Sequence, residues 1–148
     1  MNKKYTTQWI GQFAVASELV RRNYLVSLPL GNAPIRDMLC QSPSGENFTI
    51  QVKSLRSKGY FPFQDNLINK KFPDLYLVFV YIPVKLNQSL EYFILTHNRF
   101  LEVWNEEQRS WKQKEQLRGK PYKEWSNGIE YKTLLNSGAK NNWGVLPK

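Results

Sequence analysis

The chain has 148 residues, 41% of them hydrophobic, so it is long enough for one domain with a substantial core and too apolar to be disordered. Its single cysteine, Cys40, excludes an internal disulfide, fits a reducing compartment and is expected to be a small buried hydrophobe. The longest apolar run, residues 75–82, is too short to span a bilayer, and no apolar signal segment follows the basic start. We therefore expect a soluble cytoplasmic protein.

Positive charge is concentrated at the two ends of the chain. The formal net charge is +9, from 21 Lys and Arg against 12 Asp and Glu. Residues 1–60 hold 8 basic and 3 acidic residues, residues 61–108 hold 4 and 6, and residues 109–148 hold 9 and 3. This distribution favours a polyanionic partner, and we expect nucleic acid, with DNA favoured over RNA. A basic protein without such a partner would have the same total charge.

The first predicted element is a helix that is capped by Thr6 or Thr7 and runs to about Arg22. Small residues, among them Gly11, would let this helix approach a sheet closely and carry Glu18 toward the sheet edge. Glu18 is then either a solvated helix carboxylate or part of a site. The expected apolar stripe contains Ile10, Phe13, Ala14 and Ser17, and it is widened by Ala16, Leu19 and Val20.

A strand over residues 24–28 is followed by a predicted β-hairpin. The arms of the hairpin are Asp37–Gln41 and Phe48–Ser54, and a run rich in turn-forming residues separates them. Gln51 and Lys53 are two residues apart on the second arm and therefore point to the same face. The hairpin would bring both side chains to the aspartate that opens the first arm.

The order of residues in this hairpin resembles the core of the PD-(D/E)XK nucleases, a superfamily that includes many restriction endonucleases and Holliday-junction resolvases. The resemblance rests on Asp37, a turn and the triplet Gln51-Val52-Lys53, and it covers roughly residues 9–82. In that family the aspartate and the first residue of the triplet bind a divalent cation, and the lysine helps to activate water. Gln51 stands where the family usually has Asp or Glu, which resembles the Q-x-K variant of a methylation-dependent restriction branch.

The resemblance implies both a fold and a site. The fold would be α/β and restriction-endonuclease-like, with a helix before a mixed central sheet of about five strands and with flanking helices. Because the family often carries a glutamate on its first helix, the implied catalytic residues are Asp37, Gln51, Lys53 and Glu18. The implied cofactor is Mg²⁺ or Mn²⁺, and its ligands would be Asp37, Gln51 and Glu18.

Four basic residues are expected to contact nucleic-acid phosphates: Arg22, Arg36, Arg56 and Lys58. The aromatic run Tyr60–Phe63 has two interpretations, since it would either stack on unpaired bases or cover a small core. The family places a helix between the lysine strand and the next strand. Residues 55–74 of this chain show poor helical periodicity, and only residues 65–71 suit one or two helical turns.

The second half of the chain is predicted to complete the sheet and to add a basic segment. Leu75–Ile82 is expected to be a central strand that is buried on both faces, and residues 90–95 form another strand. Thr96 would cap a helix over residues 98–107. After this helix we expect a loop or arm over Gln108–Lys123. Within the single domain of residues 1–148, residues 109–148 would form a basic, Trp-rich segment whose end, at residues 141–146, packs back onto the body.

Three functional hypotheses follow from these patterns. The first is a small metal-dependent nuclease that acts on nucleic acid, with DNA favoured, and that would work as a homodimer to cut both strands of a duplex. The second is an inactive nuclease fold that binds nucleic acid or a protein partner. The third is an interaction domain in which the motif arose by chance. One cysteine and one histidine are too few for a zinc site, and no phosphate-binding loop or nucleophile elbow is present.

Overall fold

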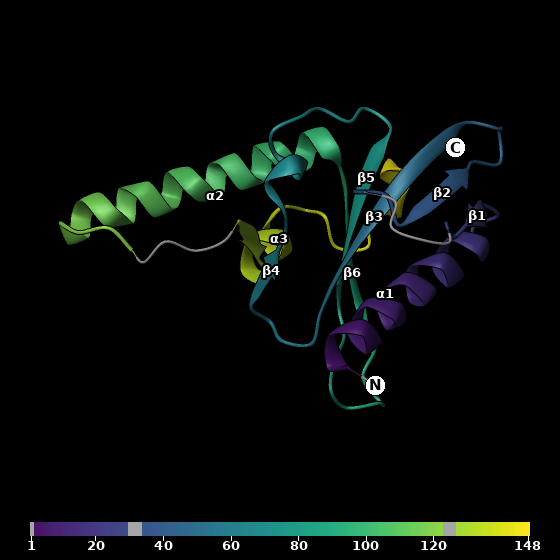
Figure 1. Cartoon of the computed structure of the whole chain (residues 1–148), viewed down its shortest axis with the longest axis horizontal. Helices are drawn as coiled ribbons and strands as arrows, with labels where there is room; N and C mark the ends of the chain where they lie inside the picture. Colours follow the sequence, from purple (N-terminus) through teal and green to yellow (C-terminus); the bar gives the residue numbers. More distant parts are fainter. Residues whose placement is uncertain (1, 30–33, 123–126) are drawn as a thin grey trace.

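A mixed sheet of five strands forms the centre of the computed structural model, which describes residues 2–29, 34–122 and 127–148. The order of the strands is β1-β2-β3-β5-β6 (Figure 1). β1, β2 and β3 are antiparallel to one another, β3 is parallel to β5, and β5 is antiparallel to β6. The α/β class with a mixed five-stranded sheet is therefore confirmed. The strands of this sheet are β1 (Leu25–Ser27), β2 (Met38–Gln41), β3 (Asn47–Leu55), β5 (Leu75–Tyr81) and β6 (Glu91–Thr96).

The expected hairpin is formed by β2 and β3. Its turn includes Gly45, whose φ of 93° lies in the left-handed region that glycine adopts without strain. The register begins at the Gln41–Asn47 pair and ends where Met38 pairs with Ile50. Because β3 is the longer strand, its residues beyond position 50 have no partner on β2. This unpaired edge of β3 determines where the candidate site lies.

Helix α1 (Lys3–Val20) packs on one face of the sheet. It starts a turn earlier than predicted, because the side chain of Asn2 caps it by accepting a hydrogen bond from the Lys4 amide at 3.0 Å. The predicted caps Thr6 and Thr7 lie inside the helix. The buried residues of α1 are Gly11, Gln12, Val15 and Leu19.

Of two predictions about the packing of α1, one is confirmed and one is wrong. The close approach to the sheet is confirmed, since a Cβ atom at Gly11 would overlap the Ser54 hydroxyl and lie 2.9 Å from Ser54 Cβ. The predicted position of Phe13 in the inward stripe is wrong, because 57% of its side-chain surface is exposed. The helix is rotated so that Val15 is buried instead, together with Leu19 of the widened stripe.

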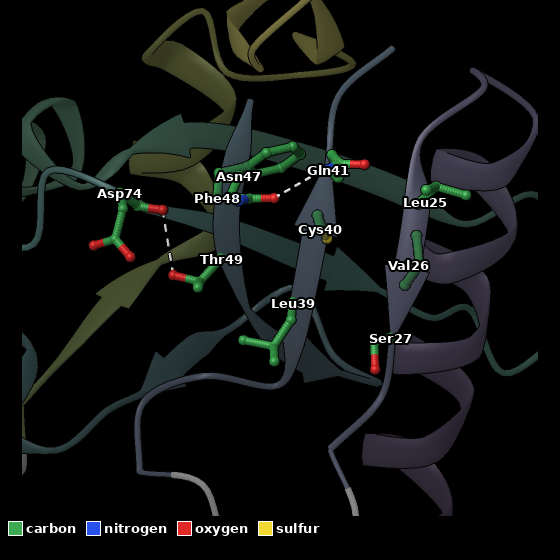
Figure 2. Close-up of a pocket in the computed structure, with 10 residues that line it drawn as sticks. All are labelled: Leu25, Val26, Ser27, Leu39, Cys40, Gln41, Asn47, Phe48, Thr49 and Asp74. Carbon is green, nitrogen blue, oxygen red and sulfur yellow. Dashed lines mark hydrogen bonds between the residues drawn. The ribbon is translucent and has the colours of Figure 1, made fainter. Parts of the chain in front are cut away.

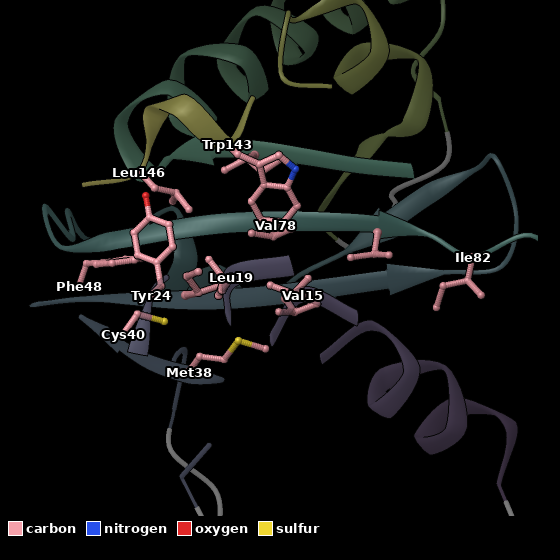
Figure 3. Packing of buried hydrophobic residues seen from close by; sticks show 14 residues of the cluster. Val15, Leu19, Tyr24, Met38, Cys40, Phe48, Val78, Ile82, Trp143 and Leu146 are labelled. Atoms are coloured by element: carbon pink, nitrogen blue, oxygen red, sulfur yellow. The ribbon is translucent and has the colours of Figure 1, made fainter. Parts of the chain in front are cut away.

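The core between α1 and the sheet also contains the end of the chain (Figure 3). Trp143 and Leu146 belong to the same buried cluster as Val15 and Val78, which confirms that this segment returns to the body. Trp143 belongs to a short 3₁₀ helix, η2 (Trp143–Val145). Cys40 is buried in the same core, as expected, and burial raises the pKa of its thiol to about 12.

The connection from β3 to β5 covers the other face of the sheet without an α-helix in the described residues. It contains β4 (Tyr60–Pro62) and the 3₁₀ helix η1 (Asp65–Leu67), so the turn expected near residues 65–71 is a short one. β4 pairs with β7 (Gly128–Glu130) in a separate two-stranded sheet. Phe61 and Phe63 are buried in a second core with Phe79 and Phe100, so of the two interpretations of Tyr60–Phe63 the core role holds for these rings.

His97 attaches this connection to the rest of the molecule. Its ring is buried, Nδ1 accepts a hydrogen bond from the Phe72 amide at 3.2 Å, and Nε2 lies 2.7 Å from the Leu67 carbonyl oxygen. With Nδ1 accepting, Nε2 carries the proton and donates to Leu67. Both ring nitrogens are thus used by the backbone of the connection, and the histidine has a structural role.

Helix α2 (His97–Arg118) is about twice as long as predicted. Thr96 caps it as expected, with the Arg99 amide donating to its hydroxyl at 3.1 Å. The loop predicted over Gln108–Lys123 is wrong, because the helix continues to Arg118 and ends at Gly119, where φ is 74°. Figure 1 shows this half of α2 extending away from the sheet. No residue from 108 to 118 is buried.

The remaining elements lie around α2 and the second core. α3 (Tyr131–Asn136) follows directly after β7. Trp125, part of the predicted Trp-rich segment, lies outside the described residues. Within the described ranges, no helix has the length and apolar character needed to cross a membrane.

Candidate functional site at the open edge of β3

A cleft of about 660 Å³ lies at the edge of β3 that β2 leaves unpaired. One wall is α1, and Gln64, Asn66 and Leu67 of the connection to β5 also line the cleft. Asp37, Gln51 and Lys53 all line this cleft, so the structure brings together the three residues of the hairpin motif. Among the described lining residues, Asp37 is the one carboxylate.

Asp37 extends the hydrogen bonding between β2 and β3 through both its backbone amide and its side chain. Its amide donates to the Ile50 carbonyl at 2.8 Å, and its Oδ2 accepts from the Val52 amide at 2.7 Å. Oδ1 accepts from Gln12 Nε2 at 3.1 Å. Burial raises the pKa of the Asp37 carboxyl above its ordinary value, although the Val52 amide, Lys53 and Gln12 each act to lower it.

Lys53 is the cationic side chain whose charge acts on the Asp37 carboxyl. Burial lowers the pKa of its ammonium group, and the negative charge of Asp37 acts in the opposite direction. In both residues desolvation is the largest effect, so the attraction between them does not fully offset the loss of water. A lysine of this kind gives up its proton more readily than an exposed lysine does.

Gln51 contributes an unused oxygen. Its Oε1 is buried and has no hydrogen-bond partner within the described part of the chain. A buried carbonyl oxygen without a donor is energetically costly, so such an atom is expected to have a partner that is not a protein group. A cation or water in the cleft would supply one.

Glu18 is not brought to the cleft. Its carboxylate pairs with Arg21 at 2.7 Å and with Arg22 at 2.5 Å, and these arginines lower the pKa of its carboxyl. The α1 residue that contacts Asp37 is Gln12, which lies six positions earlier and so about 9 Å away along the helix axis. The sequence-based expectation that Glu18 joins the motif is therefore corrected on geometric grounds.

Of the four basic residues expected to bind phosphate, Arg36 alone lines the cleft. Its guanidinium lies 3.6 Å from the Asp74 carboxylate. Arg22 is held by Glu18 and stacks over the Trp143 ring at 4.6 Å, and Lys58 pairs with Glu91 at 3.5 Å beside two tyrosine rings. Arg56 is exposed outside the cleft.

A second hollow, of about 510 Å³, lies on the open face of β1, β2 and β3 (Figure 2). Its walls include exposed Leu25 and Leu39, and its hydrogen bonds join Gln41 to Asn47 and the Thr49 hydroxyl to the Asp74 carbonyl. Asp74 is the one carboxylate among its described lining residues. The hollow lacks a partly buried acid–base pair like that of Asp37 and Lys53, so it is a weaker candidate.

The donor set of the main cleft limits which ions it suits. The described residues contain no group of three or more His, Cys, Asp or Glu side chains placed to hold a metal. One carboxylate and one amide oxygen suit a hard, hydrated cation better than zinc. Comparisons with protein families, curated proteins and solved structures found no match to this chain.

Four residues of α1 line the cleft and were not identified from the sequence as site residues: Tyr5, Gln8, Trp9 and Gln12. Their spacing of three and four positions is visible in the sequence and marks one helix face. That face was not recognised because Phe13 was assigned to the core and Glu18 was expected to be the helix residue at the site. The spacing of these residues was visible in the sequence, but the sequence did not show how the helix is rotated about its axis.

Proposed function

We propose that the protein is a metal-dependent nuclease that hydrolyses phosphodiester bonds of nucleic acid, with DNA as the favoured substrate. The observation that carries the proposal is the meeting of Asp37, Gln51 and Lys53 in one cleft at the open edge of β3. A cleft that is open at a strand edge gives an extended polymer access from the side. The net charge of +9 supports a polyanionic substrate.

The oxygen atoms of the cleft support a role for Mg²⁺ or Mn²⁺. Asp37 offers a carboxylate, and Gln51 Oε1 lacks a hydrogen-bond donor in the described residues. The Val52 amide donates to Asp37, and since the N–H and C=O of a strand residue point the same way, the Val52 carbonyl faces this edge too. Enzyme sites commonly hold Mg²⁺ with one or two carboxylates, several waters and substrate phosphates. A bound cation would polarise the phosphate and favour hydroxide formation.

Lys53 has the properties of a group that acts on the reacting phosphate. It lies on the same strand face as Gln51, beside the proposed cation ligands, and its lowered pKa makes proton loss easier than in an exposed lysine. In the proposed reaction a water oxygen forms a bond to phosphorus while the bond to the leaving oxygen breaks. Lys53 orients that water or stabilises the negative charge that builds on the phosphate.

Cleavage of a labelled panel tests the proposal. Single-stranded, duplex and branched DNA and RNA would be incubated with Mg²⁺, Mn²⁺ or a chelator, using the wild type, Asp37→Asn, Lys53→Ala and the control Lys132→Ala. Lys132 is exposed on α3, away from the cleft. We expect cation-dependent cutting by the wild type and the control, and loss of cutting in the two cleft variants. Cutting that persists in both variants would overturn the assignment.

A second function has one observation in its favour. With a single carboxylate in the cleft, the site has less negative charge than a cation site with two or three acidic ligands. This supports a protein that retains nucleic-acid binding without cleavage. Salt-sensitive binding by wild type that cuts no member of the panel, with either cation, would favour this second function over the first.

A further inference from the structure

Three aromatic side chains form an exposed row on α1, which we call the aromatic stripe: Tyr5, Trp9 and Phe13. They are four residues apart, so they follow one another along one face of the helix. Their exposed fractions are 58%, 48% and 57%. The rings of Trp9 and Phe13 stack with their centroids 5.3 Å apart and their planes at 22°.

Packing of the core does not explain the aromatic stripe. The residues that α1 buries against the sheet are Gly11, Gln12, Val15 and Leu19. The stripe lies beside this buried face and leaves its rings in water, where they forgo the gain from apolar burial. A run of exposed aromatic rings of this kind is typical of a surface that binds something.

The aromatic stripe continues into the candidate site. Tyr5 and Trp9 line the cleft together with Lys53, and the amide side chain of Gln8 lines it too. Aromatic faces stack on nucleobases, and amides form paired hydrogen bonds with base edges. Both kinds of group therefore stand a short distance from the residues that would act on the phosphate.

The charge of this region also fits a nucleic acid. α1 has no acidic residue before Glu18, and Lys3 and Lys4 are exposed at its start. Arg36 and Lys53 add positive charge at the cleft. A purely apolar partner would have to bury these cations and the glutamine amides without compensation. A strand of nucleic acid offers bases to the rings and phosphates to the cations.

We propose that the aromatic stripe binds unpaired bases, so that the substrate class of the cleft is nucleic acid with a single-stranded segment beside the scissile phosphate. Bases stacked within a duplex do not present their faces to a protein ring, whereas unpaired bases do. This inference rests on the proposed function for the identity of the substrate. Binding itself requires no cleavage, so the two ideas are tested separately.

The test measures binding in the presence of a chelator, so that no cutting occurs. Fluorescence anisotropy would follow a labelled oligothymidylate and a fully paired, blunt-ended DNA duplex of equal length. We expect Trp9→Ala and Phe13→Ala each to weaken binding of the oligothymidylate by about 5- to 150-fold and to leave duplex binding unchanged. Trp9→Phe keeps a ring and should retain most of the affinity.

A matched control comes from the same helix. Val20→Ala removes an apolar side chain that is 59% exposed and lies outside the cleft, and it should change neither affinity. Helix content and thermal unfolding of every variant should equal those of the wild type, because the rings are at the surface. Phe13→Ala, at a ring that is 57% exposed, keeps the proposal testable if Trp9→Ala proves unstable.

The possible outcomes are distinguishable. Unchanged oligothymidylate binding in Trp9→Ala and Phe13→Ala, or an equal loss on the duplex, overturns the inference. Sedimentation that shows these variants breaking a wild-type dimer, with unchanged affinity for DNA, also overturns it and makes the stripe a contact between copies. Ring-dependent binding without cation-dependent cutting supports the inference while the nuclease proposal fails. Lys53-dependent cutting with ring-independent binding supports the nuclease proposal while the inference about the stripe fails.

Discussion

Two carboxyl groups, those of Asp37 and Glu107, share one electrostatic property and differ in their surroundings. Burial is the largest cause of a raised pKa in both. Asp37 opens onto a cleft of about 660 Å³ that Lys53 also lines. Glu107, on α2, is enclosed: its Oε1 accepts from the Glu130 amide at 3.0 Å and from the Thr133 hydroxyl at 2.5 Å.

The role of Glu107 follows from the helix that it contacts. α3 has no side-chain cap at Glu130, and the carboxylate of Glu107 takes the place of one by accepting from the backbone amide there. The comparison shows that a raised pKa marks burial, and that access and a nearby cation separate a candidate site from a structural contact. The predictions below test this separation.

The largest effect is expected on cleavage. Lys53→Ala should lower the cleavage rate about 10²- to 10³-fold, the loss typical of removing one group that stabilises transition-state charge. Glu107→Gln should leave the rate within a few-fold of the wild type, because Glu107 does not line the cleft. Single-turnover cleavage with Mn²⁺ measures both. Equal losses in the two variants would show that stability, and not the cleft, controls activity.

The next effect is on stability, and it should be larger at Glu107. Glu107→Ala leaves the Glu130 amide and the Thr133 hydroxyl without their acceptor in a buried place, so unfolding free energy should fall by about 2–3 kcal/mol. Asp37→Ala should cost less, since water in the cleft can reach the groups left behind. Urea denaturation of both variants measures the difference. A larger loss at Asp37 would contradict the distinction between an open and an enclosed carboxylate.

Gly11→Ala should disturb the packing of α1 on β3 beside Asp37. The new Cβ would overlap the Ser54 hydroxyl and push α1, which carries Gln12, away from the sheet. We expect the unfolding free energy to fall by up to about 2 kcal/mol after the better helix propensity of alanine is counted. Activity should fall as well, because Gln12 contacts Asp37. Gly144→Ala, where a Cβ would meet no atom within 4 Å, is the control for both urea denaturation and cleavage.

The smallest effect is a pH dependence that both carboxyls share. A carboxyl whose pKa is raised by folding favours the protonated folded state, so its contribution to stability is present below the unfolded pKa and is lost as pH rises through the folded value. Asp37→Asn and Glu107→Gln should therefore each be more stable relative to wild type at neutral pH than in acid. Urea denaturation at several pH values checks the sign. An advantage that grows toward low pH would refute it.

The hairpin was predictable because its signals are local. Alternating apolar residues around Ile50 and a run of turn formers predict two paired strands, and the pairing brings Asp37 to Gln51 and Lys53. The contribution of Gln12 was not predictable in this way. The angle at which a helix meets a sheet depends on packing, here on the contact of Gly11 with Ser54, and one sequence does not reveal that angle.

The second half of α2 was missed for a different reason. Residues 108–118 contain no glycine or proline and are rich in Gln, Lys, Arg and Glu, which are good helix formers, and Gly119 and Pro121 mark the end. The absence of an apolar stripe led to the prediction of a loop. A pattern that reports burial does not detect a helix that buries nothing. The pairing of β4 with β7 was missed because residues so distant in sequence leave no local signal.

The projecting half of α2 has a consequence for amide hydrogen exchange. From residue 108 to 118 its backbone hydrogen bonds have no buried side chain to protect them, and Leu117 is 90% exposed. Such amides open by local fraying at little free-energy cost, whereas those near Phe100 and Val103 open only when the core does. One continuous helix should therefore contain a fast-exchanging and a slow-exchanging half, with the boundary close to Glu107.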